Sequence, residues 1–191
     1  MPFTPQQLMS GYIQGIFPMA NDDGAIYWYD PDPRTILPLD NRFHIPRRLA
    51  RTVRQGKFEI RIDYDFRLVM EYCAEREKTW ISPELIDLYT TLHRSGFAHS
   101  VETWRNGQLV GGLYGVAING LFAGESMFSL ERDASKVALV HLVSRLRRRS
   151  YLLLDVQFST AHLSRFGALS IPRAEYHARL ARALMRRTWF A

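Results

Sequence analysis

Cysteine is nearly absent from this sequence. Cys73 stands alone, which excludes an internal disulfide and any zinc site built from cysteines. No apolar run approaches the roughly 18 residues that a membrane-spanning helix requires, and the N-terminus lacks the charged and then apolar pattern of a secretory signal. No histidine pair has the spacing of a metal site on a helix. We therefore expect a cytoplasmic protein without a metal, in which Cys73 packs as a small apolar residue on a helix.

Lysine is also scarce, because only three of the 25 basic residues are lysines and the rest are arginines. The formal net charge is +6. Arginine suits planar, bidentate contacts to phosphate. Any single basic cluster is explained well by a solvated surface, but three clusters in 191 residues favour a nucleic-acid partner. The clusters cover residues 47–54, 145–149 and 179–187.

The chain has no internal repeat, linker or low-complexity segment, and its length suffices for one core plus a small subdomain. Asn106-Gly107 and Asn119-Gly120 each predict a hairpin between apolar strands. Three antiparallel strands, a helix and a further strand then predict an α+β fold. The predicted strands cover residues 26–29, 35–39, 58–63, 99–104, 108–118, 121–126 and 151–158. Helices are expected after the cap Thr4, after residues 44–46, and over 65–75, 82–93, 133–147 and 172–187, with a loop over 19–24.

Two polar clusters lie in apolar surroundings within the stretch from residue 109 to residue 157. Glu125 lies in the first cluster and Asp155 in the second. A carboxylate is expensive to bury unless it is hydrogen-bonded or used in chemistry. This stretch is therefore the part of the chain where we expect the reaction site.

Nine short motifs run in order along nearly the whole chain, and together they resemble the leucyl/phenylalanyl-tRNA–protein transferases. Any single motif would be weak, since Gly-Glu-Ser or Ser-Lys alone occurs widely. The motifs are Gly15-Ile16-Phe17-Pro18, Trp28 to Arg34, Thr79-Trp80-Ile81, His99 to Glu102, Gly111 to Val116, Gly124 to Ser129, Ala134-Ser135-Lys136, Asp155-Val156-Gln157 and Gly167-Ala168.

The resemblance implies a GNAT-like fold, the mixed sheet with packed helices of the acyl-CoA N-acetyltransferases. It implies an aminoacyltransferase that moves Leu or Phe, and weakly Met, from aminoacyl-tRNA to proteins that begin with Lys or Arg. The product is an N-degron, a destabilising N-terminus that marks a protein for degradation. An aminoacyl ester is already activated, so no cofactor is expected, and we expect a monomer.

The chain departs from the family pattern in two places. It is shorter at the N-terminus than many members, which implies a small, reduced N-terminal subdomain over residues 1–57 and a catalytic domain over 58–191. Met19 stands where some members have tryptophan. The resemblance therefore implies that Trp80 stacks on one face of the terminal adenosine of tRNA and that Met19 packs on the other. Tyr12 and Tyr89 are further candidates for that nucleotide, although buried tyrosines with structural hydroxyl bonds are commoner.

The expected catalytic residues are Asp155, Gln157 and Glu125. Asp155 and Gln157 are two apart on a strand, so both should project from one face, where the Asp155 carboxylate would polarise the Gln157 amide. The Gln157 amide oxygen would accept a hydrogen bond from the attacking amine and position it. The negative charge of Asp155 would act on that amide. The alternative is a hydrogen-bonded pair that closes the end of the sheet. The resemblance makes Glu125 a contact to the aminoacyl group, and the alternative is an ion pair with Lys136 or an arginine.

Leu and Phe require a dry apolar pocket, and the acceptor stem of tRNA requires basic residues. Leu139, Leu142, Leu146 and Leu154 are also explained by core packing. His99 and His162 are interpreted as structural. The pocket candidates are Leu113, Phe122, Leu139, Leu142, Leu146 and Leu154. The phosphate candidates are Arg47, Arg48, Arg51, Arg54, Arg145, Arg147 and Arg148.

Three other functions compete with this interpretation. An acyl-CoA N-acetyltransferase usually cradles pyrophosphate on a glycine-rich loop before a helix, but residues 130–135 contain no glycine and two acids. A non-catalytic RNA-binding protein would leave the motifs around Glu125 and Asp155 without a purpose. A transferase that leucylates Asp or Glu N-termini stays open, since the acceptor is the least constrained part of the prediction.

Overall fold

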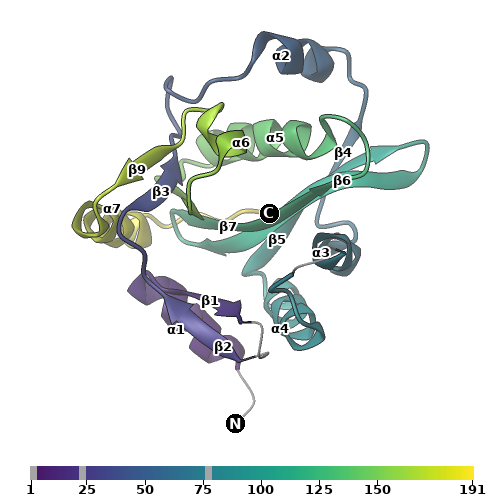
Figure 1. Cartoon of the computed structure of the whole chain (residues 1–191). Helices are drawn as coiled ribbons and strands as arrows, with labels where there is room; N and C mark the ends of the chain where they lie inside the picture. Colours follow the sequence, from purple (N-terminus) through teal and green to yellow (C-terminus); the bar gives the residue numbers. More distant parts are fainter. Residues whose placement is uncertain (1–3, 22–24, 76–78) are drawn as a thin grey trace.

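The computed structural model describes residues 4–21, 25–75 and 79–191, and within these ranges seven strands form a mixed sheet in the order β4-β5-β6-β7-β8-β3-β9. A separate two-stranded ribbon pairs β1 with β2 (Figure 1). The strands are β1 (Phe17–Ala20), β2 (Ile26–Tyr29), β3 (Arg34–Leu37), β4 (Glu59–Ile62), β5 (Ala98–Arg105), β6 (Gln108–Ile118), β7 (Leu121–Ser129), β8 (Leu153–Gln157) and β9 (Leu169–Ile171). The helices are α1 (Pro5–Gln14), α2 (Arg47–Arg54), α3 (Phe66–Ala74), α4 (Pro83–Arg94), α5 (Ala134–Arg148), α6 (Ala161–Ser164) and α7 (Arg173–Met185).

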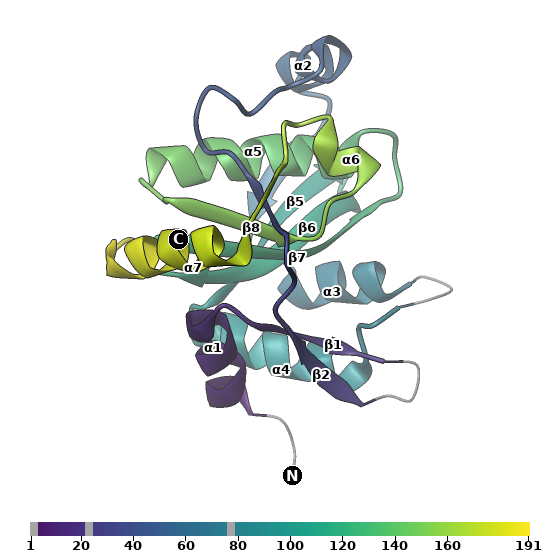
Figure 2. The same cartoon turned by 60° about the vertical axis from the view of Figure 1, so that its left-hand side comes forward.

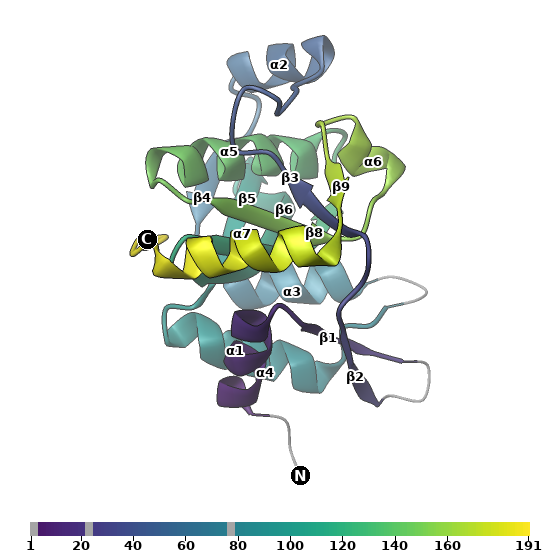
Figure 3. The same cartoon turned by 90° about the vertical axis from the view of Figure 1, so that its left-hand side faces the viewer.

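Helices cover both faces of the sheet. Helix α5 packs on β5, β6 and β7 from one face, with α2 outside it (Figures 1 and 2). Helices α3 and α4 cover the other face, and α1 with the β1–β2 ribbon lies beyond α4. Helix α7 packs against β7 and β8, as Figure 3 shows from the side. Each face therefore buries its own apolar cluster, one under α5 and one under α3 and α4.

The α+β prediction and its central antiparallel strands are confirmed. Asn106 and Asn119 both have positive φ, as the predicted hairpin turns require. Thr4 caps α1 in a reciprocal capping box with Gln7. Ser82 caps α4 as predicted, and the side chain of Asp65 caps α3.

Several boundaries differ from the predictions. Residues 19 and 20, predicted as loop, belong to β1, because Met19 and Ala20 pair with β2. The rest of that predicted loop, residues 22–24, lies outside the described residues. Strand β7 continues to Ser129 instead of ending at Ser126, since β6 still pairs with it there. Strand β9 and the single-turn helix α6 were not predicted, because three or four residues are too short for a periodic pattern.

Strand β3 enters the large sheet between β8 and β9 and pairs antiparallel with both. Arg34 at its start is thereby carried from the N-terminal region to the centre of the molecule. No helix within the described ranges is both long and apolar enough to cross a membrane.

Candidate active site

Strands β7 and β8 run side by side for only three residue pairs before they part. The last parallel pair is Ala123 with Asp155. On its other edge β7 bulges, because Gly115 pairs with Gly124 and the preceding residue pairs beyond Glu125. A Cβ on Gly115 would lie 2.3 Å from the carbonyl oxygen of Ala123, so only glycine fits opposite the bulge. The bulge places Glu125 as the extra residue on β7, without a paired residue on β6.

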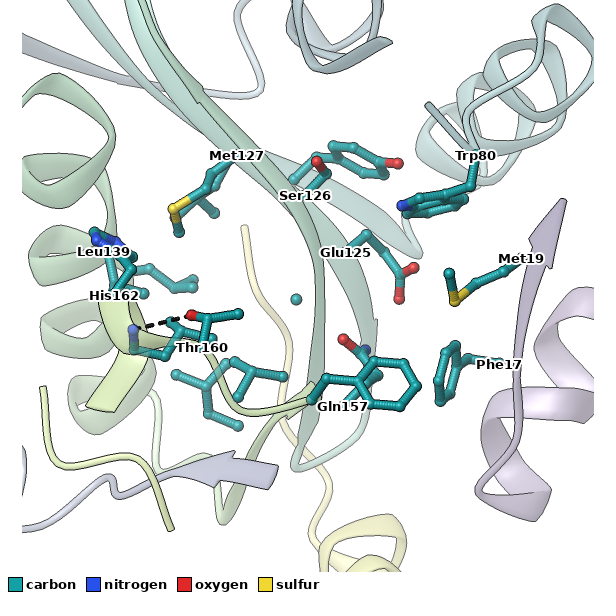
Figure 4. A pocket seen from close by; sticks show the side chains of 18 residues that line it. Phe17, Met19, Trp80, Glu125, Ser126, Met127, Leu139, Gln157, Thr160 and His162 are labelled. Atoms are coloured by element: carbon teal, nitrogen blue, oxygen red, sulfur yellow. Dashed lines mark hydrogen bonds between the residues drawn. The ribbon is translucent and has the colours of Figure 1, made fainter. Parts of the chain in front are cut away.

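A cavity of about 290 Å³ lies at this fork. Its apolar part is lined by residues from the cluster under α5, and its other part by residues from the cluster under α3 and α4. Figure 4 shows Leu139 and Met127 on one side of β7 and Trp80, Met19 and Phe17 on the other. The cavity therefore connects the two faces of the sheet, which the sequence did not predict.

Four of the six residues predicted for the aminoacyl pocket line this cavity: Leu113, Leu139, Leu142 and Leu154. The other two, Phe122 and Leu146, are absent from the lining within the described residues and lie in the core instead. The Phe122 ring lies 5.2 Å from the ring of Phe190, centroid to centroid. Leu146 is one turn further along α5 than Leu142, where its carbonyl accepts the Tyr151 N–H, so it packs beyond the cavity.

Asp155 is fully buried, and its carboxylate is hydrogen-bonded on the face of β8 that packs on α7. Arg34 holds its carboxylate with two charge-assisted bonds, Nε to Oδ1 at 2.9 Å and Nη2 to Oδ2 at 2.6 Å. The Tyr176 hydroxyl donates to Oδ2 at 3.0 Å. Burial works against the Arg34 charge, but the bonds and charge of Asp155 outweigh it and raise the pKa of Arg34. Burial, and then the charge of Asp155, raise the pKa of Tyr176.

Asp155 holds the backbone of Gln157 and not its side chain. The predicted contact between the Asp155 and Gln157 side chains is therefore replaced by a bond between the Asp155 carboxylate and the Gln157 backbone. Its N–H donates to Asp155 Oδ1 at 3.0 Å, and its φ is +59°. This left-handed conformation ends the strand alternation, and it separates the two side chains that the spacing placed together. The side chain lines the cavity, and its buried Nε2 has no hydrogen-bond partner among the described residues.

Glu125 lines the cavity with a carboxyl group that forms no ion pair with any cation among the described residues. Its Oε2 accepts a bond of 3.4 Å from the Tyr89 hydroxyl, while its Oε1 is buried without a partner among the described residues. Lys136 bonds to Asp133 instead, at 2.9 Å, so the predicted alternative of a Glu125–Lys136 pair is wrong. Burial is the main cause that raises the pKa of Glu125 to about 8, and the charge of Asp155 adds to it.

Tyr12 and Tyr89, predicted as nucleotide contacts, lie under Glu125 and are fully buried. Their hydroxyls are 2.6 Å apart, and they continue the hydrogen-bond chain that ends at Glu125. Burial, followed by the nearby Glu125 charge, raises the pKa of both phenols well above the ordinary value. Trp80 and Met19, the other two candidates for the nucleotide, line the cavity from the side of α4 and β1.

Replacing Glu125 by Gln should stabilise the empty protein more at pH 8.5 than at pH 5. A buried carboxyl with a folded pKa of about 8 keeps its proton while the unfolded chain loses it above about pH 4.5. Wild-type stability therefore falls with rising pH over that window and then levels, and Glu125→Gln lacks this titration. We expect the difference in unfolding free energy to grow by about 4 kcal/mol, because the window from pH 5 to the folded pKa spans about three units at about 1.4 kcal/mol each. Urea unfolding across this pH range measures it, and a difference independent of pH would contradict the raised pKa.

Comparison with known proteins decides the family. A family model described as leucyl/phenylalanyl-tRNA protein transferase matches residues 36–181, and the model of its N-terminal domain matches residues 1–32. The chain belongs to this family. A leucyl/phenylalanyl-tRNA--protein transferase of Herpetosiphon aurantiacus is 61% identical over 181 residues, which cover 95% of this chain and 94% of that protein. Those of Salinibacter ruber and Gloeobacter violaceus are each 53% identical over 182 residues, covering 95% of this chain and 80% and 94% of theirs.

Likeness to a solved structure is much weaker. The C-terminal domain of an Agrobacterium fabrum protein described as a lysylphosphatidylglycerol synthetase matches with a TM-score of 0.42 and 13% identity, covering 93% of this chain and 62% of that chain. A similarity at this level carries no argument about the fold. The family, an aminoacyltransferase family, is established by the sequence matches alone.

In this transferase the predicted phosphate contacts on α2 differ in their surroundings. Arg47, Arg51 and Arg54 are exposed. Arg48 is exposed as well, but its Nη2 bonds to both carboxylate oxygens of Asp133 at 3.1 Å. The first three therefore present their guanidinium groups to solvent beside α5.

The predicted phosphate contacts on α5 have structural partners. Arg145 Nε donates to the Phe190 carbonyl at 2.8 Å and tethers the C-terminal segment. Arg147 Nε donates to the Leu39 carbonyl at 3.0 Å, which fixes the chain after β3. Arg148 bonds to Ser144 within its own helix at 2.8 Å. Arg145 and Arg147 therefore join α5 to distant parts of the chain, while the bond of Arg148 stays within its helix.

The two histidines interpreted as structural have different settings. The His99 ring bonds to Asp63 at 2.7 Å and to the Gly96 carbonyl at 3.1 Å, within the core. His162 lines the cavity from α6, and burial, followed by nearby positive charge, lowers its pKa. No group of three potential metal-binding side chains gathers anywhere in the described part of the chain.

Sequence reasoning assigned no role to several residues that build the transferase site. Arg34 and Tyr176 hold Asp155, and Phe17 and Phe158 form an aromatic wall with ring centroids 5.7 Å apart. Phe17 also lies under the Arg34 guanidinium, 4.7 Å from its centre. Arg34 and Phe17 stand inside two of the quoted motifs, which was the available signal, and nothing in the sequence singled out Tyr176.

Proposed function

We propose that this protein transfers Leu or Phe, and Met weakly, from aminoacyl-tRNA to the α-amino group of proteins that begin with Lys or Arg, and so creates an N-degron. The observation that carries the proposal is the cavity at the fork. Its apolar part under α5 suits an aliphatic or aromatic hydrocarbon side chain, and its polar part holds Glu125 and Gln157. The family to which the chain belongs supports aminoacyl-tRNA as donor.

The donor would bind along the cavity. The Leu or Phe side chain enters the apolar part, its free α-ammonium lies at Glu125, and the terminal adenosine lies between Trp80 and Met19. An ammonium beside Glu125 favours the charged carboxylate, which offsets the burial that raises its pKa. Residues 1–57 contribute Phe17 and Met19 to this site, in line with the proposed small N-terminal segment. The exposed arginines of α2 would contact the acceptor stem.

The reaction needs positioning more than it needs a strong base. The acceptor amine attacks the ester carbonyl carbon, the new C–N bond forms, and the bond to the ribose oxygen breaks. The ribose oxygen leaves with a proton that the amine gives up. The Gln157 amide oxygen accepts a hydrogen bond from the amine and orients it, while Asp155 acts through the Gln157 backbone. The activated ester supplies the driving force, so we propose no cofactor and no metal. A cytoplasmic monomer with a GNAT-like fold completes the proposal.

Radiolabelled Leu-tRNA mixed with acceptor peptides tests this function. We expect labelling of peptides that begin with Lys or Arg, abolished by ribonuclease and independent of CoA. Discrimination against Met should be about 10- to 200-fold, because a hydrophobic pocket separates similar side chains by only about 1–3 kcal/mol.

Two results would redirect the assignment. Labelling of peptides that begin with Asp or Glu, but not of those with Lys or Arg, would favour the alternative acceptor class. Acetylation from acetyl-CoA would favour an N-acetyltransferase, although Asp133 stands at the N-terminus of α5, where its carboxylate opposes a pyrophosphate.

A further inference from the structure

The β1–β2 ribbon turns one face towards the cavity. Phe17 and Met19 line the cavity from this face. The register places Tyr29 opposite Phe17 and Tyr27 opposite Met19. Residues directly opposite each other in an antiparallel pair project from the same face. Tyr27 therefore stands beside Met19 on the face that borders the cavity.

The other face of the ribbon packs on α1. A Cβ on Gly11 would lie 2.0 Å from the ring of Trp28, so this ring sits directly on the glycine. Trp28 and Tyr27 are neighbours on β2 and project to opposite faces. Trp28 thus anchors the ribbon on α1, and Tyr27 projects from the face that borders the cavity.

Tyr27 is a large aromatic residue that the fold leaves uncovered. It is 47% exposed, and within the part of the chain that the structure describes its side chain makes no hydrogen bond or ring contact. Tyr29, on the same face, stacks on Phe17 with centroids 6.0 Å apart and donates its hydroxyl to Asn21 at 2.8 Å. The two tyrosines therefore differ: Tyr29 has structural partners, while Tyr27 presents its ring to solvent at the border of the cavity.

We propose that Tyr27 stacks on the second-last nucleobase of the tRNA 3′ end. The inference rests on the proposed function, which places the terminal adenosine between Trp80 and Met19. Met19 lines the cavity and Tyr27, its cross-strand neighbour, lies outside the lining, so the nucleotide that follows the adenosine out of the cavity meets Tyr27. Any base can stack on an exposed aromatic ring. The ribbon thereby carries an aromatic platform on the side where Met19 offers only a thioether.

Donors of increasing length test this role. Transfer to an Arg-starting peptide is measured with three donors that carry leucine as an ester on the ribose of the terminal adenosine. They are leucyl-adenosine, the leucyl ester of the dinucleotide cytidylyl-adenosine, and Leu-tRNA. In the wild type the second nucleotide should lower the KM of the donor. Tyr27→Ala should reduce this lowering of the KM by the second nucleotide roughly 5- to 150-fold, because stacking of a base on an aromatic ring is worth about 1–3 kcal/mol. Tyr27→Phe should keep the advantage, and the effect should fall on KM and not on kcat.

The controls separate this role from folding and from the function itself. Tyr64→Ala removes a tyrosine that is 65% exposed and packs on Trp104, away from the cavity lining, and it should keep the wild-type advantage. An unchanged advantage in Tyr27→Ala, an equal loss in Tyr27→Phe, or a rise in the KM of the acceptor peptide would each overturn the role of Tyr27. A wild type that transfers from none of the three donors would instead count against the proposed function.

Discussion

Replacing Asp155 by Ala should lower the free energy of unfolding by about 3–5 kcal/mol, since it strands a buried arginine without its partner. The Arg34 and Asp155 side chains are each 1% exposed, and two hydrogen bonds join them. Arg34 also donates to the Gly15 carbonyl at 3.0 Å and lies against the rings of Phe17 and Tyr176. The loss should therefore reach the N-terminal segment, β8 and α7 together. Urea unfolding at neutral pH measures it.

A double variant tests the electrostatic cause. Arg34→Met with Asp155→Leu removes both charges and keeps apolar volume, so it should recover most of the stability that Asp155→Ala loses. Activity should stay low in both variants, because the Gln157 N–H loses its acceptor in each. A cost below 1 kcal/mol for Asp155→Ala would show that the pair is not the anchor that its burial indicates.

Replacing Gln157 by Gly should lower kcat by roughly 100-fold while leaving the fold as stable as before or more so. The left-handed φ of +59° costs a residue other than glycine about 1–2 kcal/mol, and glycine removes that cost. The backbone N–H still bonds to Asp155, so the change removes the amide side chain and nothing else of the network. Loss of a group that orients the nucleophile typically costs about two orders of magnitude in rate.

Steady-state transfer from Leu-tRNA, with urea unfolding in parallel, checks this prediction. Gln157→Asn is the matched variant, because asparagine tolerates the left-handed conformation and keeps a shorter amide. It should fall between the wild type and Gln157→Gly in kcat. Full turnover by Gln157→Gly, or by Asp155→Ala combined with Gln157→Ala, would rule out the proposed positioning role.

Local elements were predicted where a short stretch of sequence contains its own cause. The turns at Asn106 and Asn119 and the cap at Thr4 depend on residues within a few positions, and each was confirmed. Residues 19 and 20 of β1 were predicted as loop because a four-residue strand has too few positions to show a period, and its pairing with β2 is a tertiary event.

The pocket shows the same division at a larger scale. Helical spacing put Leu139, Leu142 and Leu146 on one stripe, and the first two line the cavity. The stripe extends past the end of the cavity, so Leu146 packs on the core side. Periodicity defines which face of a helix is buried, but not which part of that face meets a ligand.

The sequence by itself determined the family, the α+β class and the two polar motifs that meet at one site, because these depend on residue types in a fixed order. Only the tertiary structure decided how those motifs meet. The left-handed turn at Gln157 sends its side chain to the cavity and leaves Asp155 against Arg34 and Tyr176, residues more than 120 and 20 positions away in the chain. Such partners are set by the crossing of β3 and the packing of α7, which no local pattern encodes.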